Sequence, residues 1–170
     1  VNQETEARRR IAAAGLDDRA TVQRGHYHTL PAESFDAIAS VGMYEHVGAR
    51  RLREYCHAAY RALRPGGVFL NHGITLPVGH RARTGGDFIF RHIFPGAELL
   101  PLSTVQAALE DAGFEILDDQ SLRPHYALTL REWFRRFQAA RADAVRLSSE
   151  RTARMWEVYL AGCARGFELG

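Results

Sequence analysis

Apolar residues recur at helical spacing in several stretches of this chain. In residues 49–63 they fall three or four positions apart, so they share one stripe of a helix that faces a core. A helix over residues 2–14 should end at Gly15, because glycine readily adopts the left-handed backbone that closes a helix. The same spacing predicts further helices over residues 103–112, 130–147 and 150–167.

Short apolar runs between these helices predict strands. The run 37–43 is continuous rather than alternating, which is typical of a strand buried on both faces of a parallel sheet. Residues 68–70 begin the next such strand, directly after a turn at residues 64–67. Shorter strands are predicted at residues 20–24 and 114–117. Helices that alternate with buried strands predict an α/β fold.

Residues 75–102 lack a regular pattern and contain several glycines and prolines. Long loops in compact domains are usually functional, so we expect a lid or a substrate-facing insertion there. Helical spacing by itself predicts burial of the apolar residues in the last two helices. These residues are Trp133, Phe134, Phe137, Trp156, Tyr159, Leu160 and Phe167.

Two polar side chains stand where neighbouring strands are predicted to end. Glu45 follows the run 37–43, and His72 follows the strand that begins at residue 68. In open α/β sheets, ligands bind outside the carboxyl ends of the strands, so an acid and an imidazole delivered there together indicate a working site. Taken singly, Glu45 would be an ordinary charge at a helix N-terminus and His72 a core histidine.

The composition indicates one globular domain, because 170 residues of which 46% are hydrophobic are enough to bury a sizeable core. A net charge of +2 and a pI near 8.8 tolerate an anionic membrane surface but are far from the charge of a nucleic-acid-binding protein. All 22 basic residues are arginine, and from this we infer no partner.

Several features favour a cytoplasmic location. Cys56 and Cys163 stand alone in helix-like stretches, which favours a reducing compartment. No apolar run approaches the roughly 18 residues that a membrane-crossing helix needs. The first residues carry charges and no hydrophobic signal region.

A metal site is not predicted. His26 and His28 are two residues apart and would share a face of a strand, but no third ligand has a recognisable spacing.

Four blocks in a fixed order carry a resemblance to a known family. They are FDAIASVGMYEHVG (35–48), ALRPGGVFLNHGIT (62–75), FIFRHIFPGAELLPLSTV (88–105) and SLRPHYALTLREWFRRF (121–137). Together they resemble the cyclopropane-fatty-acyl-phospholipid synthase family, which includes the mycolic acid cyclopropane synthases and related lipid methyltransferases. The resemblance implies a Rossmann-like class I methyltransferase sheet, with residues 75–102 and 121–167 covering the acyl-chain pocket.

The resemblance also implies a set of site residues. The active-site glutamate and histidine of the family fall on Glu45 and His72, and the isoleucine whose backbone lines the same site is Ile74. The tyrosine of the PHY block is Tyr126. In the family these groups hold a bicarbonate ion, which acts as general base beside the transferred methyl group.

S-adenosylmethionine is the implied methyl donor. The resemblance places Gly25 and His26 beside its adenine and Gly42 near its methionine part. A glycine-rich turn after a first strand and an acidic residue after a second, which bind such a cofactor, do not occur in this sequence. It resembles the later part of a catalytic domain without its last strand. We therefore expect exposed sheet edges and a chain that is unstable or inactive alone.

The expected activity is methyl transfer to carbon that closes a cyclopropane ring on an unsaturated phospholipid acyl chain, with peripheral membrane contact. Three alternatives stay open at this point: a methyl-branched or otherwise altered lipid product, a small-molecule methyltransferase on the same scaffold, and a non-catalytic lipid-binding module. The sequence does not determine the acyl length, the double-bond position or the oligomeric state.

Overall fold

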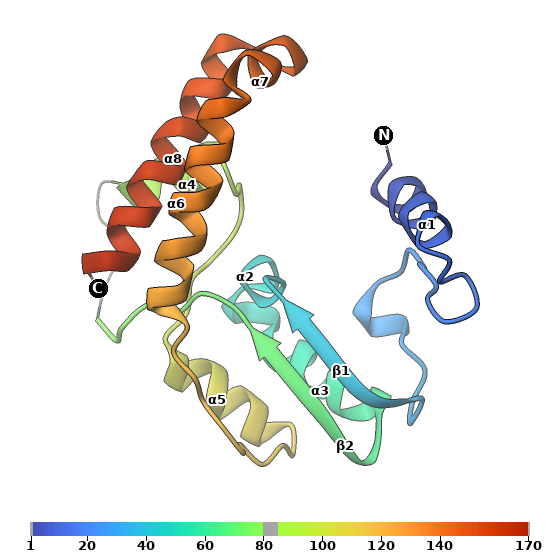
Figure 1. Ribbon diagram of the computed structural model, residues 1–170. Coiled ribbons are helices and arrows are strands. Elements are labelled where there is room, and N and C mark those ends of the chain that lie inside the picture. The colour runs from blue at the N-terminus through green and yellow to red at the C-terminus, as the bar shows by residue number, and fades with distance from the viewer. Residues whose placement is uncertain (1, 80–84, 170) are drawn as a thin grey trace.

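The structure, a computed structural model, describes residues 2–79 and 85–169 (Figure 1). Its α-helices are α1 (Gln3–Ala13), α2 (Tyr44–Val47), α3 (Leu52–Ala62), α4 (Gly85–His92), α5 (Leu102–Asp111), α6 (Arg123–Ala139), α7 (Arg141–Leu147) and α8 (Glu150–Leu169). The strands are β1 (Phe35–Val41) and β2 (Leu63–His72), and two short 3₁₀ helices are η1 (Tyr27–Thr29) and η2 (Ala49–Arg51).

The two strands form a parallel pair joined through α3, as the α/β prediction requires. Val41 pairs with His72 at the carboxyl ends, so both strands end side by side. At the other end, Phe35 pairs with Leu63 but Ala37 pairs with Val68, so the intervening residues of β2 bulge out of the ladder. The turn predicted at residues 64–67 is this bulge.

Helices α3 and α5 cover one face of the sheet. The apolar stripe of α3 is buried as predicted, with Leu52, Tyr55 and Cys56 at 2%, 3% and 0% exposure. It packs against Val105 and Leu109 of α5 in one core cluster. The helical spacing in the sequence therefore identified this core correctly.

The opposite face of the sheet is open, so the prediction of burial on both faces is wrong for the described residues. Val41 is 67% exposed, and Val68 and Leu70 are each 56% exposed. The physical reason is that the covering helices α3 and α5 pack on one side only (Figure 1).

The strands predicted at residues 20–24 and 114–117 do not form. A strand needs a neighbour to complete its backbone hydrogen bonds, and neither segment joins the pair β1–β2. The Val22 carbonyl instead accepts a hydrogen bond from the Arg8 side chain of α1 at 2.7 Å. Phe114 and Ile116 pack on the core as apolar side chains without strand pairing.

The second layer is a helical pair, α6 and α8, that stands beyond the carboxyl ends of the strands (Figure 1). Leu130 of α6 and Tyr159, Leu160 and Ala164 of α8 are its buried centre. The predicted helix over residues 130–147 is divided between α6 and α7, and α6 begins earlier, at Arg123.

Most of the aromatics predicted to be buried in this layer pack there, but two are corrections. Phe134, Phe137 and Phe167 lie against the buried centre. Trp133 and Trp156 are 47% and 38% exposed, because each large ring sits at the margin of a layer only two helices wide.

The stretch 75–102 is not a continuous loop. Thr75 bridges to Leu100, which closes the stretch at its base, and α4 forms within it and packs against α8. Residues 80–84 of the predicted lid lie outside the described residues. No helix in the described part of the chain is long and apolar enough to cross a membrane.

Candidate active site

A carboxylate is buried in the turn that follows β1. Glu45 lies in the first turn of α2 and is 6% exposed. Its Oε1 accepts a hydrogen bond from the Ile74 amide at 2.9 Å. Its Oε2 is buried and has no hydrogen-bond partner among the described residues. Because an unpartnered buried carboxylate oxygen is costly, Oε2 is suited to a ligand that donates to it.

An imidazole nitrogen at the end of the neighbouring strand is also buried without a hydrogen-bond partner among the described residues. His72 closes β2, and its carbonyl accepts a hydrogen bond from the Gly42 amide at 2.8 Å. Its Nδ1 is buried without a partner in the described part of the chain. The predicted placement of Glu45 and His72 after neighbouring strands is confirmed, while their chemical roles remain predictions.

Tyr44 holds the backbone that carries Ile74, a role that spacing along the chain did not indicate. Tyr44 is 2% exposed, and its hydroxyl donates to the Ile74 carbonyl at 2.9 Å. The ring leaves room only for glycine at position 73, because a Cβ there would lie 2.2 Å from the Tyr44 Cε1. Burial, with the charge of Glu45, raises the pKa of Tyr44, so its hydroxyl remains a neutral donor.

Tyr126 approaches this region from the helical layer. It lies in the first turns of α6, where its amide donates to the Leu122 carbonyl at 2.9 Å and its ring packs on Phe167. Burial raises the pKa of Tyr126, and the negative charge of Glu45 adds to the rise. The tertiary structure therefore brings a neutral phenol within electrostatic range of the Glu45 carboxylate.

A hollow of about 270 Å³ lies along β1 and opens beside the site. Its walls include Tyr27, Ser40, Met43, Tyr55 and Phe69. The Ser40 hydroxyl is buried and makes no hydrogen bond within 3.5 Å to a described residue, although it lies close enough to the Tyr55 hydroxyl to lower the pKa of that group, which burial raises. This is a mostly apolar pocket with one free polar group, as small-molecule sites commonly are.

The predicted cofactor residues lie around this hollow but do not line it. Gly42 directly follows β1 with a φ of +63°, and a Cβ there would meet nothing within 4 Å, so its surroundings are open. Gly25 and His26 are exposed and precede η1, whose Tyr27 does line the hollow. Their contact with a cofactor stays a prediction.

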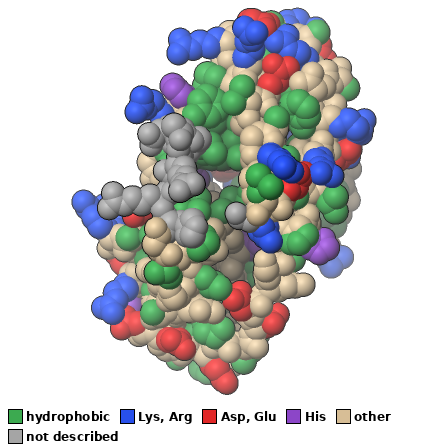
Figure 2. All heavy atoms as spheres, turned by 90° about the vertical axis from the view of Figure 1, so that its left-hand side faces the viewer, with side chains coloured by type: hydrophobic (Ala, Val, Ile, Leu, Met, Phe, Trp, Pro, Cys, Tyr) green, Lys and Arg blue, Asp and Glu red, His purple; other side chains and the backbone are tan. Residues whose placement is uncertain are grey.

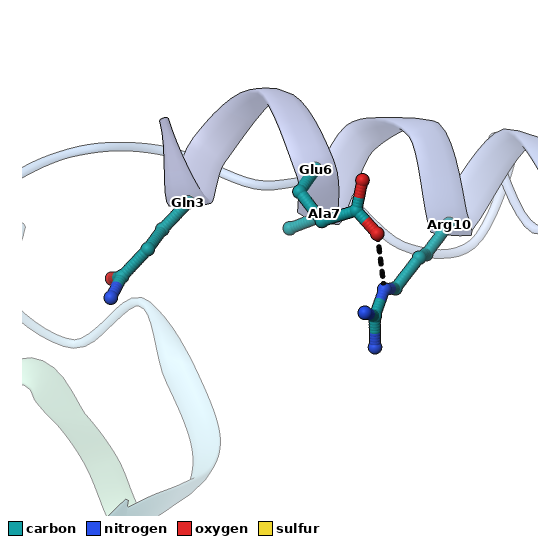
Figure 3. A pocket seen from close by; sticks show the side chains of 4 residues that line it. All are labelled: Gln3, Glu6, Ala7 and Arg10. Atoms are coloured by element: carbon teal, nitrogen blue, oxygen red, sulfur yellow. Dashed lines mark hydrogen bonds and ion pairs between the residues drawn. The ribbon is translucent and has the colours of Figure 1, made fainter. Parts of the chain in front are cut away.

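A second hollow carries no comparable chemistry. It is open and lined by Gln3, Glu6, Ala7 and Arg10, all on α1 (Figure 3). Glu6 and Arg10 pair with each other at 2.7 Å, and α1 lies away from the strand ends (Figures 1 and 3). Within residues 2–79 and 85–169, no three His, Cys, Asp or Glu side chains cluster as a metal site would require.

The family model described as mycolic acid cyclopropane synthetase matches residues 1–170. The chain belongs to the mycolic acid cyclopropane synthetase family. The family predicted from the four sequence blocks is therefore confirmed.

The relatives that this chain matches are longer proteins than the chain itself. A "Probable fatty acid methyltransferase" of Pseudomonas putida is 44% identical over 170 residues, which cover 96% of this chain and 42% of that protein. "Tuberculostearic acid methyltransferase UfaA1" of Mycobacterium tuberculosis is 39% identical over 178 residues, covering 100% of this chain and 40% of that protein. The chain thus spans about two fifths of the length of these relatives.

A solved structure of the same family matches the fold. Mycolic acid cyclopropane synthase CmaA1, complexed with SAH and CTAB, has a TM-score of 0.88 and 32% identity to this chain. The match covers 99% of this chain and 63% of that one. The predicted Rossmann-like methyltransferase fold is therefore confirmed. This chain corresponds to part of that fold.

Sequence reasoning missed the contacts that three residues make in this candidate site. Tyr44 and Ser40 both lie in the block that contains Glu45. The partner of Tyr44, Ile74, comes from another segment, and spacing along the chain did not reveal that the Ser40 hydroxyl is buried. Glu98 donates its amide to the Glu45 carbonyl at 2.7 Å from a distant loop. Its place in the FPGAEL segment was the available signal.

Proposed function

We propose that this chain provides the catalytic site of an S-adenosylmethionine-dependent methyltransferase that forms a cyclopropane ring on unsaturated fatty acyl chains. The observation that carries the proposal is the pair of buried, unpartnered polar atoms, Glu45 Oε2 and His72 Nδ1, at the ends of neighbouring strands. The mostly apolar helical layer rises above them.

The polar groups fit a bicarbonate ion. Bicarbonate has one hydroxyl donor and oxygens that accept. Glu45 Oε2 can accept from the hydroxyl, while the Tyr126 hydroxyl and His72, in the tautomer with its hydrogen on Nδ1, can donate to the other oxygens. The Ile74 amide already occupies Glu45 Oε1, so one carboxylate oxygen is left for this purpose.

When bound, S-adenosylmethionine supplies an electrophilic methyl group, and bicarbonate supplies a base for the proton that the alkylated chain must lose. The residues of the chain act by position. Glu45, His72 and Tyr126 orient the anion, and burial around Glu45 excludes water that would compete for the cationic chain.

The cofactor is proposed to lie in the hollow along β1. Ser40 offers a free hydroxyl there, and Gly42 leaves open space at the strand end. Gly25 and His26 lie next to η1, which forms part of the wall, and would contact the adenine. The CmaA1 structure that this chain resembles is a complex with SAH, which supports the same cofactor here.

The acyl chain is proposed to enter under the helical layer, which consists of α6 and α8 with α4 packed against α8. Ile89, Ile93 and Phe134 contribute apolar side chains to this layer. Hydrophobic side chains gather over the upper part of the face in Figure 2, and the surface is hollowed midway down that face. Apolar side chains of this kind are suited to contact a hydrocarbon chain.

A peripheral position at the inner face of the cytoplasmic membrane is proposed for the protein. Its substrate would lie in phospholipid, and exposed arginines of the helical layer, such as Arg131, Arg135 and Arg136, could contact anionic headgroups.

The test is mass spectrometry of fatty acids in a bacterial host that makes unsaturated lipids and lacks its own synthase, expressing this chain in its complete reading frame. A gain of one CH₂ on unsaturated chains is expected, and fragmentation should show a ring. A host that expresses Glu45→Gln provides the control. A folded, cofactor-bound protein that gives no gain would contradict the proposal and favour a small-molecule substrate. A folded protein without cofactor binding would favour a non-catalytic module.

A methyl-branched product is the second candidate. The relatives from Pseudomonas putida and Mycobacterium tuberculosis are named fatty acid and tuberculostearic acid methyltransferases, which favours methyl transfer without ring closure as the other outcome. The same fragmentation measurement distinguishes a branch from a ring.

A further inference from the structure

A second acidic residue holds the backbone of the turn that carries Glu45. Glu98 lies in the loop between α4 and α5, and its amide donates to the Glu45 carbonyl at 2.7 Å. Its side-chain Oε2 accepts a hydrogen bond from the Ala49 amide at 2.8 Å. One residue from a distant loop thus contacts the turn both within α2 and just after it.

These contacts provide hydrogen-bond partners for backbone groups that the short helix α2 leaves unpaired. The helix has only four residues and ends at Val47, so its last carbonyls have no later helical amide to accept from. Its carbonyl at Glu45 and the free amide at Ala49, where η2 begins, would otherwise depend on water. Because Glu98 satisfies both, it restrains the backbone from which the Glu45 side chain extends.

Gly48 shows how closely the Glu98 carboxylate approaches. Gly48 ends α2 with a φ of +73°, and a Cβ built there would lie 3.0 Å from Glu98 Oε2. The turn therefore requires glycine for its left-handed backbone and has little room for a side chain under the carboxylate.

The same loop also contacts the helical layer. Phe94 meets His46 of α2 edge to face at 6.1 Å between ring centroids, and it meets Tyr159 of α8 at 5.7 Å. The loop that carries Glu98 is thus fixed between the Glu45 turn and the layer proposed to cover the acyl chain.

We propose that Glu98 is a positioning residue for Glu45. Its amide bond to the Glu45 carbonyl and the bond that its carboxylate accepts from the Ala49 amide hold the α2 turn, so that Glu45 meets the Ile74 amide and presents its other oxygen to the anion. This inference rests on the proposed function for the role of the anion. The restraint on the Glu45–Ile74 contact can be measured separately.

The experiment compares Glu98→Ala, Glu98→Asp and Glu98→Gln with the unaltered protein in its complete reading frame. Gln retains the length and an acceptor oxygen for the Ala49 amide, whereas Asp retains the charge but is shorter. Glu54→Ala is the matched control, because Glu54 is exposed in the first turn of the adjoining helix α3 and pairs with His28. The readouts are hydrogen exchange at the Ile74 amide by NMR and the bicarbonate concentration that gives half-maximal methylation.

Glu98→Ala and Glu98→Asp are expected to speed exchange at Ile74 about ten-fold and to raise the half-maximal bicarbonate concentration about ten-fold, as loss of a supporting residue does at other sites. Glu98→Gln and Glu54→Ala should stay within about two-fold of the unaltered protein. If Ala proves unable to fold, the Asp variant decides.

The proposal is overturned if exchange at Ile74 is unchanged while only the Ala49 amide loses protection, since Glu98 would then be a local cap. If the unaltered protein shows no bicarbonate dependence, the proposed base is wrong, and the Ile74 measurement still decides the role of Glu98.

Discussion

The Glu45 carboxylate accepts a hydrogen bond from the Ile74 amide at 2.9 Å, across 29 residues of sequence. This contact joins the turn after β1 to the segment after β2. It fixes one carboxylate oxygen and leaves the other, Oε2, buried and without a partner among the described residues. Glu45 Oε2, which receives no hydrogen bond from the described residues, is therefore the oxygen available to a ligand.

Replacement of Glu45 by Gln should separate folding from activity. The amide oxygen of Gln can still accept from the Ile74 amide, so the free energy of unfolding should change little. The second position becomes an NH₂ donor, which cannot accept the hydroxyl of the proposed bicarbonate, and methylation of unsaturated lipid should fall about 100-fold. Lipid mass spectrometry gives the rate, with Glu110→Gln on the exposed face of α5 as control. Undiminished turnover would remove Glu45 from the site.

Tyr126→Phe tests whether the phenol acts as a neutral donor. Burial and the Glu45 charge raise the pKa of Tyr126 above its ordinary value of 10.0, so the hydroxyl stays protonated through the neutral and mildly alkaline range. Removing it should lower methylation about ten-fold, by the same factor at about pH 7 and about pH 9. The measurement is the ratio of variant to unaltered rates across that range. A ratio that rises toward one at pH 9 would mean that Tyr126 ionises and is not the donor proposed here.

The core around Cys56 should make the protein sensitive to alkali. Burial raises the pKa of the Cys56 thiol from 9.0 to about 11. The thiol holds its proton more tightly when folded, so its contribution to stability is complete below about pH 9 and is lost as pH rises toward about 11. Over that window Cys56 should account for a slope approaching 1.4 kcal/mol per pH unit.

Urea unfolding at several pH values measures this slope. Cys56→Ala should reduce the slope by the amount that one titrating proton contributes. The same variant should also lower the free energy of unfolding at neutral pH, because it leaves a cavity in the core. An unchanged slope in the alanine variant would show that other groups cause the alkaline loss. Tyr55, whose pKa burial raises to about 12, contributes only at the upper end of the range.

Gly73→Ala should be strongly destabilising, because the new methyl group would overlap the buried Tyr44 ring at 2.2 Å. Overpacking of this kind costs roughly 1–3 kcal/mol, and we expect the upper end because Tyr44 is also hydrogen-bonded to Ile74. Gly162→Ala is the matched control: it lies within α8, nothing would meet its Cβ within 4 Å, and it should gain about 0.5–1 kcal/mol. Denaturant unfolding compares the two, and equal stability would contradict the contact.

Local patterns predicted the parts of the fold whose stability is local. The helical stripe of α3 is buried as expected, and Gly15 ends α1 with a φ of +66°. The predicted strand at 20–24 failed, because a strand forms only where a neighbour completes its hydrogen bonds. The predicted burial of Trp133 and Trp156 was wrong for a related reason. Spacing shows that residues share a face of a helix, but not whether another element covers that face.

The sequence by itself determined the family, the α/β alternation and the placement of Glu45 and His72 after neighbouring strands, since each depends on residues close together in the chain. Only the tertiary structure decided which atoms are free. Ile74, Tyr126 and Glu98 reach the Glu45 region from three other segments, and the resulting hydrogen bonds and burial depend on how those segments pack. Contacts across such separations leave no periodic trace in the sequence, because the chain between them can vary without changing the contact.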